Sequence, residues 1–168
     1  MNADSWIHHL HLEPHPECGY FRRIYTATWC IPADVLPDRG EARPVATAIY
    51  YLLKGQQQAR LHRLKSDELW HFYLGSSLVV HVFEPDGNYV AWRLGAELSA
   101  DQHLCVAVRA GCWFGATVVD PDGFSLVGCT VAPGFDFADF EMADREALLG
   151  RYPQYAALIE RLTADHCF

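Results

Sequence analysis

Short apolar runs alternate with polar turns through the middle of the chain, from about residue 45 to residue 133. The turns, at residues 85–88, 109–111 and 120–123, contain the Gly, Pro, Asn and Asp that reverse a chain. The runs predict strands at residues 48–53, 68–74, 78–83, 89–94, 103–108, 113–119 and 125–131. Strands about 8–12 residues apart favour a sandwich or barrel, because each needs a second sheet to bury its apolar face.

Helical periodicity is confined to the two ends of the chain. Asp144 is a suitable N-cap for a helix over residues 145–151, and Pro153 suits the first position of a second helix. Residues 5–10 predict a short N-terminal helix. The apolar positions of the second C-terminal helix are Tyr155, Leu158, Ile159 and Leu162.

Two segments precede the regular strands. Residues 20–29 predict an N-terminal strand, and residues 32–44, rich in Pro, Asp, Arg and Gly, predict an exposed loop. Either could cross to a second copy of the chain.

The length of 168 residues predicts a single domain spanning residues 1–168. Hydrophobic residues make up 51% and charged residues 20%, which excludes a disordered chain. The net charge of −8 argues against a nucleic-acid partner, which requires a basic face. There is neither a membrane-spanning apolar run nor a signal-peptide pattern, so we expect a cytoplasmic protein with no membrane partner. The six cysteines form no CxxC pair, and we expect free thiols.

Residues 55–75 carry the most chemical information. His62 lies on one predicted strand and Glu68 on the next, with a turn at residues 65–67 between them. Period-two alternation places His62 on the same face as Leu64, and Glu68 on the same face as Trp70 and Phe72. If both faces point inward, an imidazole and a carboxylate meet among aromatic side chains, as a general acid/base pair or half of a metal site.

The spacing of His62, Leu64, Glu68 and Gly75 resembles the first motif of the cupin superfamily, G(X)5HXH(X)3–4E(X)6G. In that motif, two histidines and a glutamate bind a divalent metal inside a small jelly-roll barrel. The second cupin motif, G(X)5PXG(X)2H(X)3N, corresponds to residues 108–114, with Gly111 as its second glycine.

Five segments resemble, in order, the uncharacterised cupin subfamily known as DUF985, or Cupin_5. They are residues 14–21 (PHPECGYF), 49–53 (IYYLL), 62–70 (HRLKSDELW), 111–116 (GCWFGA) and 127–137 (VGCTVAPGFDF). The resemblance implies an all-β cupin fold, a double-stranded β-helix or jelly-roll barrel, with short helices at the N- and C-terminal ends. The jelly roll would span about residues 18–137, and a C-terminal helical tail about residues 143–164.

The sequence departs from the cupin metal-binding pattern at two ligand positions. The second histidine of the pattern falls on Leu64 and the third on Phe114. A metal held by His62 and Glu68 alone would lack the three or four protein ligands that such sites usually have. We therefore expect no cofactor, with a divalent metal at His62 and Glu68 as the weaker alternative.

We predict His62 and Glu68 as catalytic residues. Predicted ligand contacts come from Tyr50, Ser66, Trp70, Phe72, Trp113 and Phe114. Each also has a structural interpretation, the aromatic residues as core and Ser66 as part of the turn. His15, in a Pro-His-Pro-Glu turn, is interpreted as structural.

Three functions remain open at this point. The first is a metal-independent isomerase or epimerase that transfers protons on a sugar or keto compound, by analogy with cupin sugar-nucleotide epimerases. There His62 would be the base, Glu68 its proton-sharing partner and a tyrosine the acid. The second is a non-catalytic module that binds a small polar molecule in the barrel. The third is a divalent-metal dioxygenase or isomerase with a degraded site. Because jelly-roll cupins commonly pair through their sheets, we also expect a homodimer.

Overall fold

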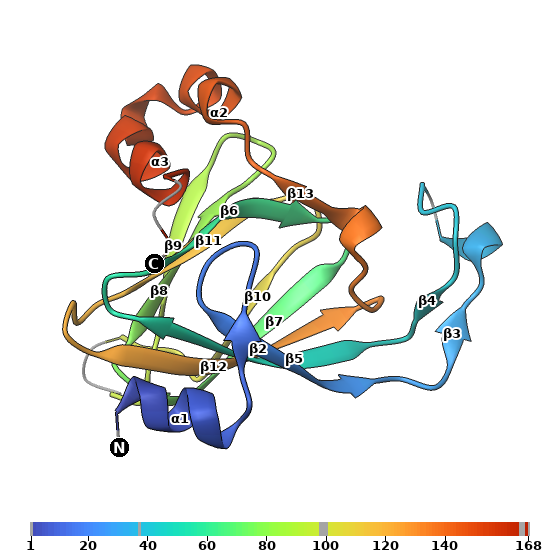
Figure 1. The fold of residues 1–168 in the computed structure, drawn as a ribbon. Coiled ribbons are helices and arrows are strands. Elements are labelled where there is room, and N and C mark those ends of the chain that lie inside the picture. The colour runs from blue at the N-terminus through green and yellow to red at the C-terminus, as the bar shows by residue number, and fades with distance from the viewer. Residues whose placement is uncertain (1, 37, 98–100, 165–166, 168) are drawn as a thin grey trace.

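Two antiparallel sheets form the body of the protein (Figure 1). The computed structural model describes residues 2–36, 38–97, 101–164 and 167. The first sheet contains, in spatial order, β1 (Glu13–Pro14), β2 (Tyr20–Thr26), β5 (Thr47–Lys54), β12 (Phe124–Ala132), β7 (Asp67–Gly75) and β10 (Cys105–Val108). The second contains β13 (Phe140–Met142), β6 (Gln58–Leu64), β11 (Trp113–Val118), β8 (Leu78–Phe83) and β9 (Tyr89–Leu94). The predicted all-β architecture is confirmed.

The facing sides of the two sheets enclose the main core. The largest side chains that are fully buried there are Tyr51, Trp70 and Phe114, surrounded by aliphatic residues from both sheets. Full burial of one such side chain contributes roughly 1.5–3 kcal/mol to stability. Trp70 and Leu64 both belong to this core, so the predicted inward faces of β6 and β7 are the ones observed.

Short helices cover the outer faces of the sheets. They are α1 (Ala3–His9), α2 (Arg145–Arg151) and α3 (Ala156–Leu162), with 3-10 turns η1 (Ala33–Val35), η3 (Phe137–Asp139) and η4 (Pro153–Tyr155). Leu148 of α2 and Ile159 of α3 pack on Leu61 and Phe83 of the second sheet. The predicted N-cap is confirmed, since Oδ1 of Asp144 accepts a hydrogen bond from Ala147 N at 2.8 Å. No helix among the described residues is long and apolar enough to cross a membrane.

The segment predicted as an exposed loop, residues 32–44, contains regular structure in the part that the structure describes, residues 32–36 and 38–44. It contains η1 and β4 (Arg43–Pro44), which pairs with β3 (Cys30–Ile31) in an arm that extends from the barrel (Figure 1). Arg43 is 1% exposed, and its Nε donates to Oδ2 of Asp139 at 2.8 Å. This buried ion pair anchors the base of the arm to the body, a long-range contact that local sequence signals do not predict.

Strand β2 ends at Thr26 rather than at residue 29, and β13 was not predicted. β13 has only three residues, too few for a periodic signal. It exists because it pairs with the edge of β6, with Phe140 opposite Leu64 and Met142 opposite His62. This pairing brings Phe140 over the end of the barrel where the candidate site lies.

Candidate functional site

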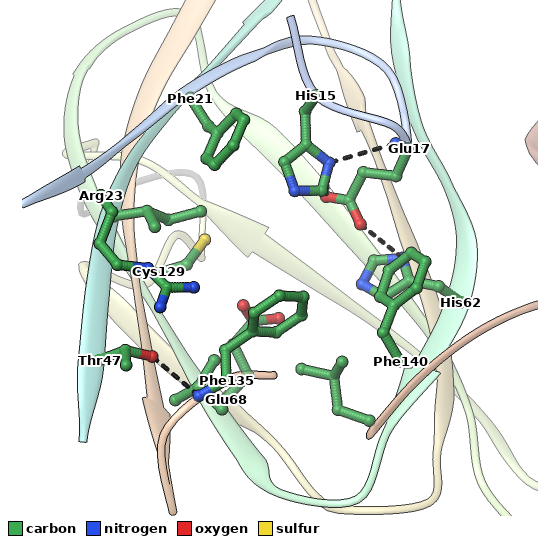
Figure 2. A pocket seen from close by; sticks show the side chains of 13 residues that line it. His15, Glu17, Phe21, Arg23, Thr47, His62, Glu68, Cys129, Phe135 and Phe140 are labelled. Carbon is green, nitrogen blue, oxygen red and sulfur yellow. Dashed lines mark hydrogen bonds and ion pairs between the residues drawn. The ribbon is translucent and has the colours of Figure 1, made fainter. Parts of the chain in front are cut away.

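A small cavity lies at one end of the barrel, between the two sheets (Figure 2). The centre of a water-sized sphere can move through about 30 Å³ of it, which is room for a few waters or one small molecule. Its lining residues come from the loop before β2, from six strands (β2, β5, β6, β7, β12 and β13) and from the segment after β12. They are His15, Glu17, Phe21, Arg23, Thr47, Ile49, His62, Leu64, Glu68, Cys129, Val131, Phe135 and Phe140.

A tight turn between β1 and β2 turns His15 and Glu17 toward this cavity. His15 N donates to Gly19 O at 2.9 Å, and Cys18 N donates to His15 O at 3.0 Å. Gly19 has a φ of +78°, and a Cβ there would lie 2.8 Å from the carbonyl oxygen of Leu52. Only glycine fits that position without strain. Arg60 N donates to Glu17 O at 2.9 Å, which fixes the turn against β6.

Glu17 and His62 form a buried ion pair. Oε2 of Glu17 lies 3.0 Å from Nδ1 of His62, and the carbonyl oxygen of Arg60 lies 2.7 Å from the same nitrogen. Burial alone would lower the pKa of His62, but the charge and hydrogen bond of Glu17, the charge of Glu68 and the hydrogen bond to Arg60 O together outweigh burial and raise it. Burial alone would raise the pKa of Glu17, but the two nearby histidines and two hydrogen bonds lower it. Glu17 therefore favours the imidazolium form of His62, and Nε2 of His62 faces the cavity (Figure 2).

His15 is neutral and its tautomer follows from its hydrogen bonds. Burial and the charge of His62 lower the pKa of His15 more than Glu17 raises it. Nδ1 of His15 accepts a hydrogen bond from Glu17 N at 3.2 Å, so the ring proton of the neutral form is on Nε2. That Nε2–H points into the cavity (Figure 2) as a donor.

Glu68 completes the group of titratable side chains. It is 7% exposed, and burial raises its pKa to about 7, partly opposed by the charge of His62. Oε2 of Glu68 accepts a hydrogen bond from Nε1 of Trp70 at 3.0 Å, which holds the carboxyl group in place. A carboxyl group with this pKa exchanges its proton near neutral pH, as a general acid or base requires.

The structure places four of the eight sequence-predicted site residues at or beside the cavity. His62 and Glu68 line it. Trp70 binds Glu68, and the ring of Phe114 packs against the ring of His62 with centroids 4.2 Å apart. These two aromatic residues position the titratable groups from behind.

The other four do not line the cavity. Tyr50 faces outward and packs edge-on against Tyr73. The ring of Trp113 also faces outward, 4.5 Å beneath the guanidinium of Arg63. Phe72 packs against the main core, while the hydroxyl of Ser66 donates to Pro133 O at 2.6 Å as part of the turn.

Glu17 is not among the site residues predicted from the sequence, and the structural interpretation of His15 does not account for its place at the cavity. Both come from the Pro-His-Pro-Glu segment, where two titratable residues precede a Cys-Gly turn. That concentration of titratable side chains beside a required glycine was the available signal. The partner on β6 lies far along the chain and could not be inferred from spacing.

The donor set does not fit a metal ion. Within residues 2–36, 38–97, 101–164 and 167, no three His, Cys, Asp or Glu side chains are arranged to hold one. Leu64 and Phe114, which have apolar side chains, stand at two ligand positions of the cupin pattern. Nδ1 of His62 is already in contact with Glu17 and with the Arg60 carbonyl oxygen.

The chain is similar to known proteins in both sequence and fold. Residues 4–143 match the family described as Cupin superfamily (DUF985). A protein from Shewanella oneidensis is 38% identical, with a TM-score of 0.88, over 99% of both chains. A hypothetical protein from Leishmania major is 33% identical, also with a TM-score of 0.88, over 98% of this chain and 100% of that one. A mutant of Bacillus subtilis oxalate decarboxylase shares the fold alone, at 14% identity and a TM-score of 0.55, over 94% of this chain and 38% of that one.

No curated protein matches this chain. The family match covers most of the sequence, and the two more similar structures extend over nearly the whole of it. The chain belongs to the DUF985 (Cupin_5) family of the cupin superfamily.

Proposed function

We propose that the cavity binds a small polar molecule and catalyses metal-independent proton transfer on it, as an isomerase or epimerase of a sugar or keto compound. The observation that carries the proposal is the convergence of His15, Glu17, His62 and Glu68 on one small cavity. Buried titratable groups with pKa values displaced by burial and by specific partners are concentrated at catalytic sites.

Glu68 is the proposed general base and acid. With a pKa of about 7, it is ionised in part of the molecules near neutral pH and can take a proton from a carbon next to a carbonyl group. The electron pair of the C–H bond then moves to the carbonyl oxygen and forms an enolate. Glu68 then returns a proton to the same carbon, which restores the carbonyl group, so no further reactant is consumed.

His62 and His15 are the proposed electrophiles. The imidazolium of His62, held by Glu17, stabilises negative charge on the enolate oxygen, and the Nε2–H of His15 is a second donor. This assignment differs from the one based on sequence, in which His62 was the base, because an imidazolium has no free electron pair to accept a proton. No tyrosine lines the cavity among the described residues, so Glu68 also takes the role of acid.

Exchange of carbon-bound hydrogen with solvent tests this chemistry directly. The protein is incubated in deuterium oxide with a panel of keto sugars, keto acids and simple ketones, and proton NMR follows the signals next to each carbonyl group. We expect exchange of at least one compound, slowed by about 100-fold or more in Glu68→Gln. Glu141→Gln, which removes an exposed carboxylate bound to Arg63, is the matched control and leaves exchange unchanged.

Undiminished exchange in Glu68→Gln would refute the role of Glu68. Saturable binding of a compound without exchange would instead favour the non-catalytic binding module. Circular dichroism and thermal unfolding of each variant separate loss of chemistry from loss of fold.

The proposal includes assembly of two copies into a homodimer. Apolar side chains are exposed at the end of β2 and along the arm, among them Trp29 at 81% and Val35 at 62%. Exposed apolar patches mark association surfaces, and an arm that extends from each copy can lie on the other. Sedimentation should give twice the 19.0 kDa of one chain, and Trp29→Ser should shift the protein toward the monomer. A wild-type monomer at micromolar concentration contradicts it.

A further inference from the structure

Arg23 of β2 lines the cavity but has no acidic partner among the described residues. Its guanidinium lies 5.7 Å from the centroid of the Phe135 ring, and it makes no ion pair or hydrogen bond with any residue that the structure describes. Figure 2 shows the side chain reaching from β2 toward the same interior that the titratable groups face. The backbone of Arg23 pairs with Ile49 of β5, so the sheet places this residue beside the cavity, where it is exposed at the mouth.

Other arginines near this end of the barrel are paired. Arg39 and Arg43 bind Asp139, and Arg63 binds Glu141 at 2.7 Å. Of the two carboxylates in the cavity, Glu17 is bound to His62 and Glu68 is bound to Trp70. Arg23 therefore retains its planar set of donors, which matches the two oxygens of a carboxylate.

Two further donors face the same space. Nε2–H of His15 and Nε2–H of His62 have no hydrogen-bond partner among the described residues, and His15 is 9% exposed while His62 is 3% exposed. Buried donors without a protein partner need an acceptor from a ligand or water. The cavity thus offers hydrogen-bond donors from Arg23, His15 and His62. Glu68 is the one carboxyl group there that is not in an ion pair, so the lining favours a ligand rich in oxygen acceptors.

We propose that the ligand of this cavity is a small carboxylate, bound through its carboxylate group by Arg23 at the mouth while its polar end reaches His15 and His62. The inference rests on the proposed function, and it narrows the substrate class to keto acids or hydroxy acids. The small size of the cavity agrees with a compact acid rather than a sugar nucleotide, because the centre of a water-sized sphere can move through only about 30 Å³ of it.

Calorimetric titration with pyruvate, lactate and acetate, and with pyruvamide as the uncharged analogue of pyruvate, tests this. We expect saturable binding of at least one carboxylate and about tenfold weaker binding of pyruvamide than of pyruvate. Arg23→Gln should weaken carboxylate binding by about tenfold or more and leave pyruvamide unchanged. Arg23→Lys, which keeps the charge but not the planar donors, should restore part of the affinity. The matched control is Arg22→Gln, on the neighbouring position of β2 beside Tyr50, with no effect.

Equal affinities for pyruvate and pyruvamide, absence of saturable binding by all three carboxylates, or unchanged binding in Arg23→Gln would each overturn the inference. So would tighter binding of inorganic phosphate or a phosphate monoester than of any carboxylate. Carboxylate binding that depends on Arg23 but without hydrogen exchange would support this inference and count against the proposed function. Exchange of uncharged ketones without saturable binding of any carboxylate would do the reverse.

Discussion

His62 and His81 are both buried on the second sheet, at 3% and 9% exposure, but they differ in charge. His62 on β6 faces the cavity and binds a carboxylate, so its pKa is raised. His81 on β8 binds only hydroxyl groups, with Tyr89 Oη at 2.7 Å and Thr117 Oγ1 at 3.0 Å. Burial, with a smaller contribution from Arg161, lowers the pKa of His81 to about 4.

The comparison shows that burial alone does not identify a functional histidine. Both imidazole rings are removed from water, and the hydrogen-bond partner of each ring determines which protonation state is favoured. A hydroxyl group donates or accepts and so satisfies the neutral ring, whereas a carboxylate stabilises the charged ring. His81 is therefore a hydrogen-bonded structural residue, and His62 is a cation held at a cavity.

The largest expected effect comes from removing the carboxylate that makes His62 different. Glu17→Ala leaves a buried imidazole without its counter-ion and should cost about 3 kcal/mol or more in the free energy of unfolding, measured in urea. The pair contributes fully at about pH 5.5, because the Glu17 contribution is lost as pH falls through its lowered pKa and that of His62 as pH rises through its raised pKa. NMR titration of His62 in this variant should give a lower pKa than in the wild type, since burial is then opposed only by the charge of Glu68 and the Arg60 carbonyl group.

The exposed pair of Arg63 and Glu141 on the same edge is the matched control for this first change. Its Nη2–Oε2 distance is 2.7 Å, but both side chains are about half exposed. Glu141→Ala should cost about 0.5 kcal/mol or less, because solvent screens the charges. Equal costs at the two sites would contradict the assignment of a buried ion pair to Glu17 and His62.

Glu68→Gln tests the second titratable group of the cavity and should stabilise the protein at alkaline pH. The pKa of Glu68 is about 7 in the fold, above its ordinary value, so folding penalises the ionised form. The wild type should lose stability as pH rises from about 4.5 to 7, by roughly 3 kcal/mol in total. The amide cannot ionise, so the advantage of the variant in urea unfolding should be absent near pH 4 and full near pH 8.

The pKa of Asp67, the neighbour of Glu68 in the chain, is shifted in the opposite direction. Hydrogen bonds from Ala110 N and Arg109 lower the pKa of Asp67 in spite of its partial burial. Asp67→Asn should therefore destabilise the protein at neutral pH, and this cost should disappear as pH falls through the lowered pKa of Asp67. A pH-independent difference for Glu68→Gln would show that its carboxyl group is not perturbed by burial.

The sequence predicted the parts of the site that depend on neighbours along the chain. His62 and Glu68 flank one turn on two strands, and period two was enough to place both inward. Glu17 contacts His62 across two separate segments, and only the assembled barrel brings them together. The cupin motifs supported the fold for the same reason, since they record local strands and turns.

The prediction of which side chains point inward was wrong where a strand is apolar on both faces. Tyr50 and Tyr51 are adjacent on β5, and only Tyr51 points inward, where its hydroxyl donates to Cys18 O at 2.7 Å. Trp113 and Phe114 pose the same question on β11, and only Phe114 reaches His62. Because helices cover the outer faces of both sheets, outward positions are apolar too, and hydrophobicity does not reveal which side faces the cavity.

His81→Gln tests the structural member of the pair and should show a smaller effect. Loss of its two hydrogen bonds should cost about 1–2 kcal/mol near pH 7. The wild type itself loses stability as pH falls from 6.5 towards 4, because folding penalises protonation of His81. The difference between variant and wild type should therefore narrow in acid, measured by urea unfolding. His8→Gln, an exposed position, should show neither effect.

Tyr89→Phe should give the smallest effect, because it removes one hydroxyl and leaves the ring in place. Nδ1 of His81 loses its partner at 2.7 Å, while Nε2 keeps Thr117, so the cost should be about 1 kcal/mol. Binding of pyruvate and hydrogen exchange should stay at wild-type levels, because His81 and Tyr89 do not line the cavity. Weaker pyruvate binding or slower hydrogen exchange in folded Tyr89→Phe would mean that the surroundings of His81 affect His62. The division between a charged cavity histidine and a neutral structural one would then fail.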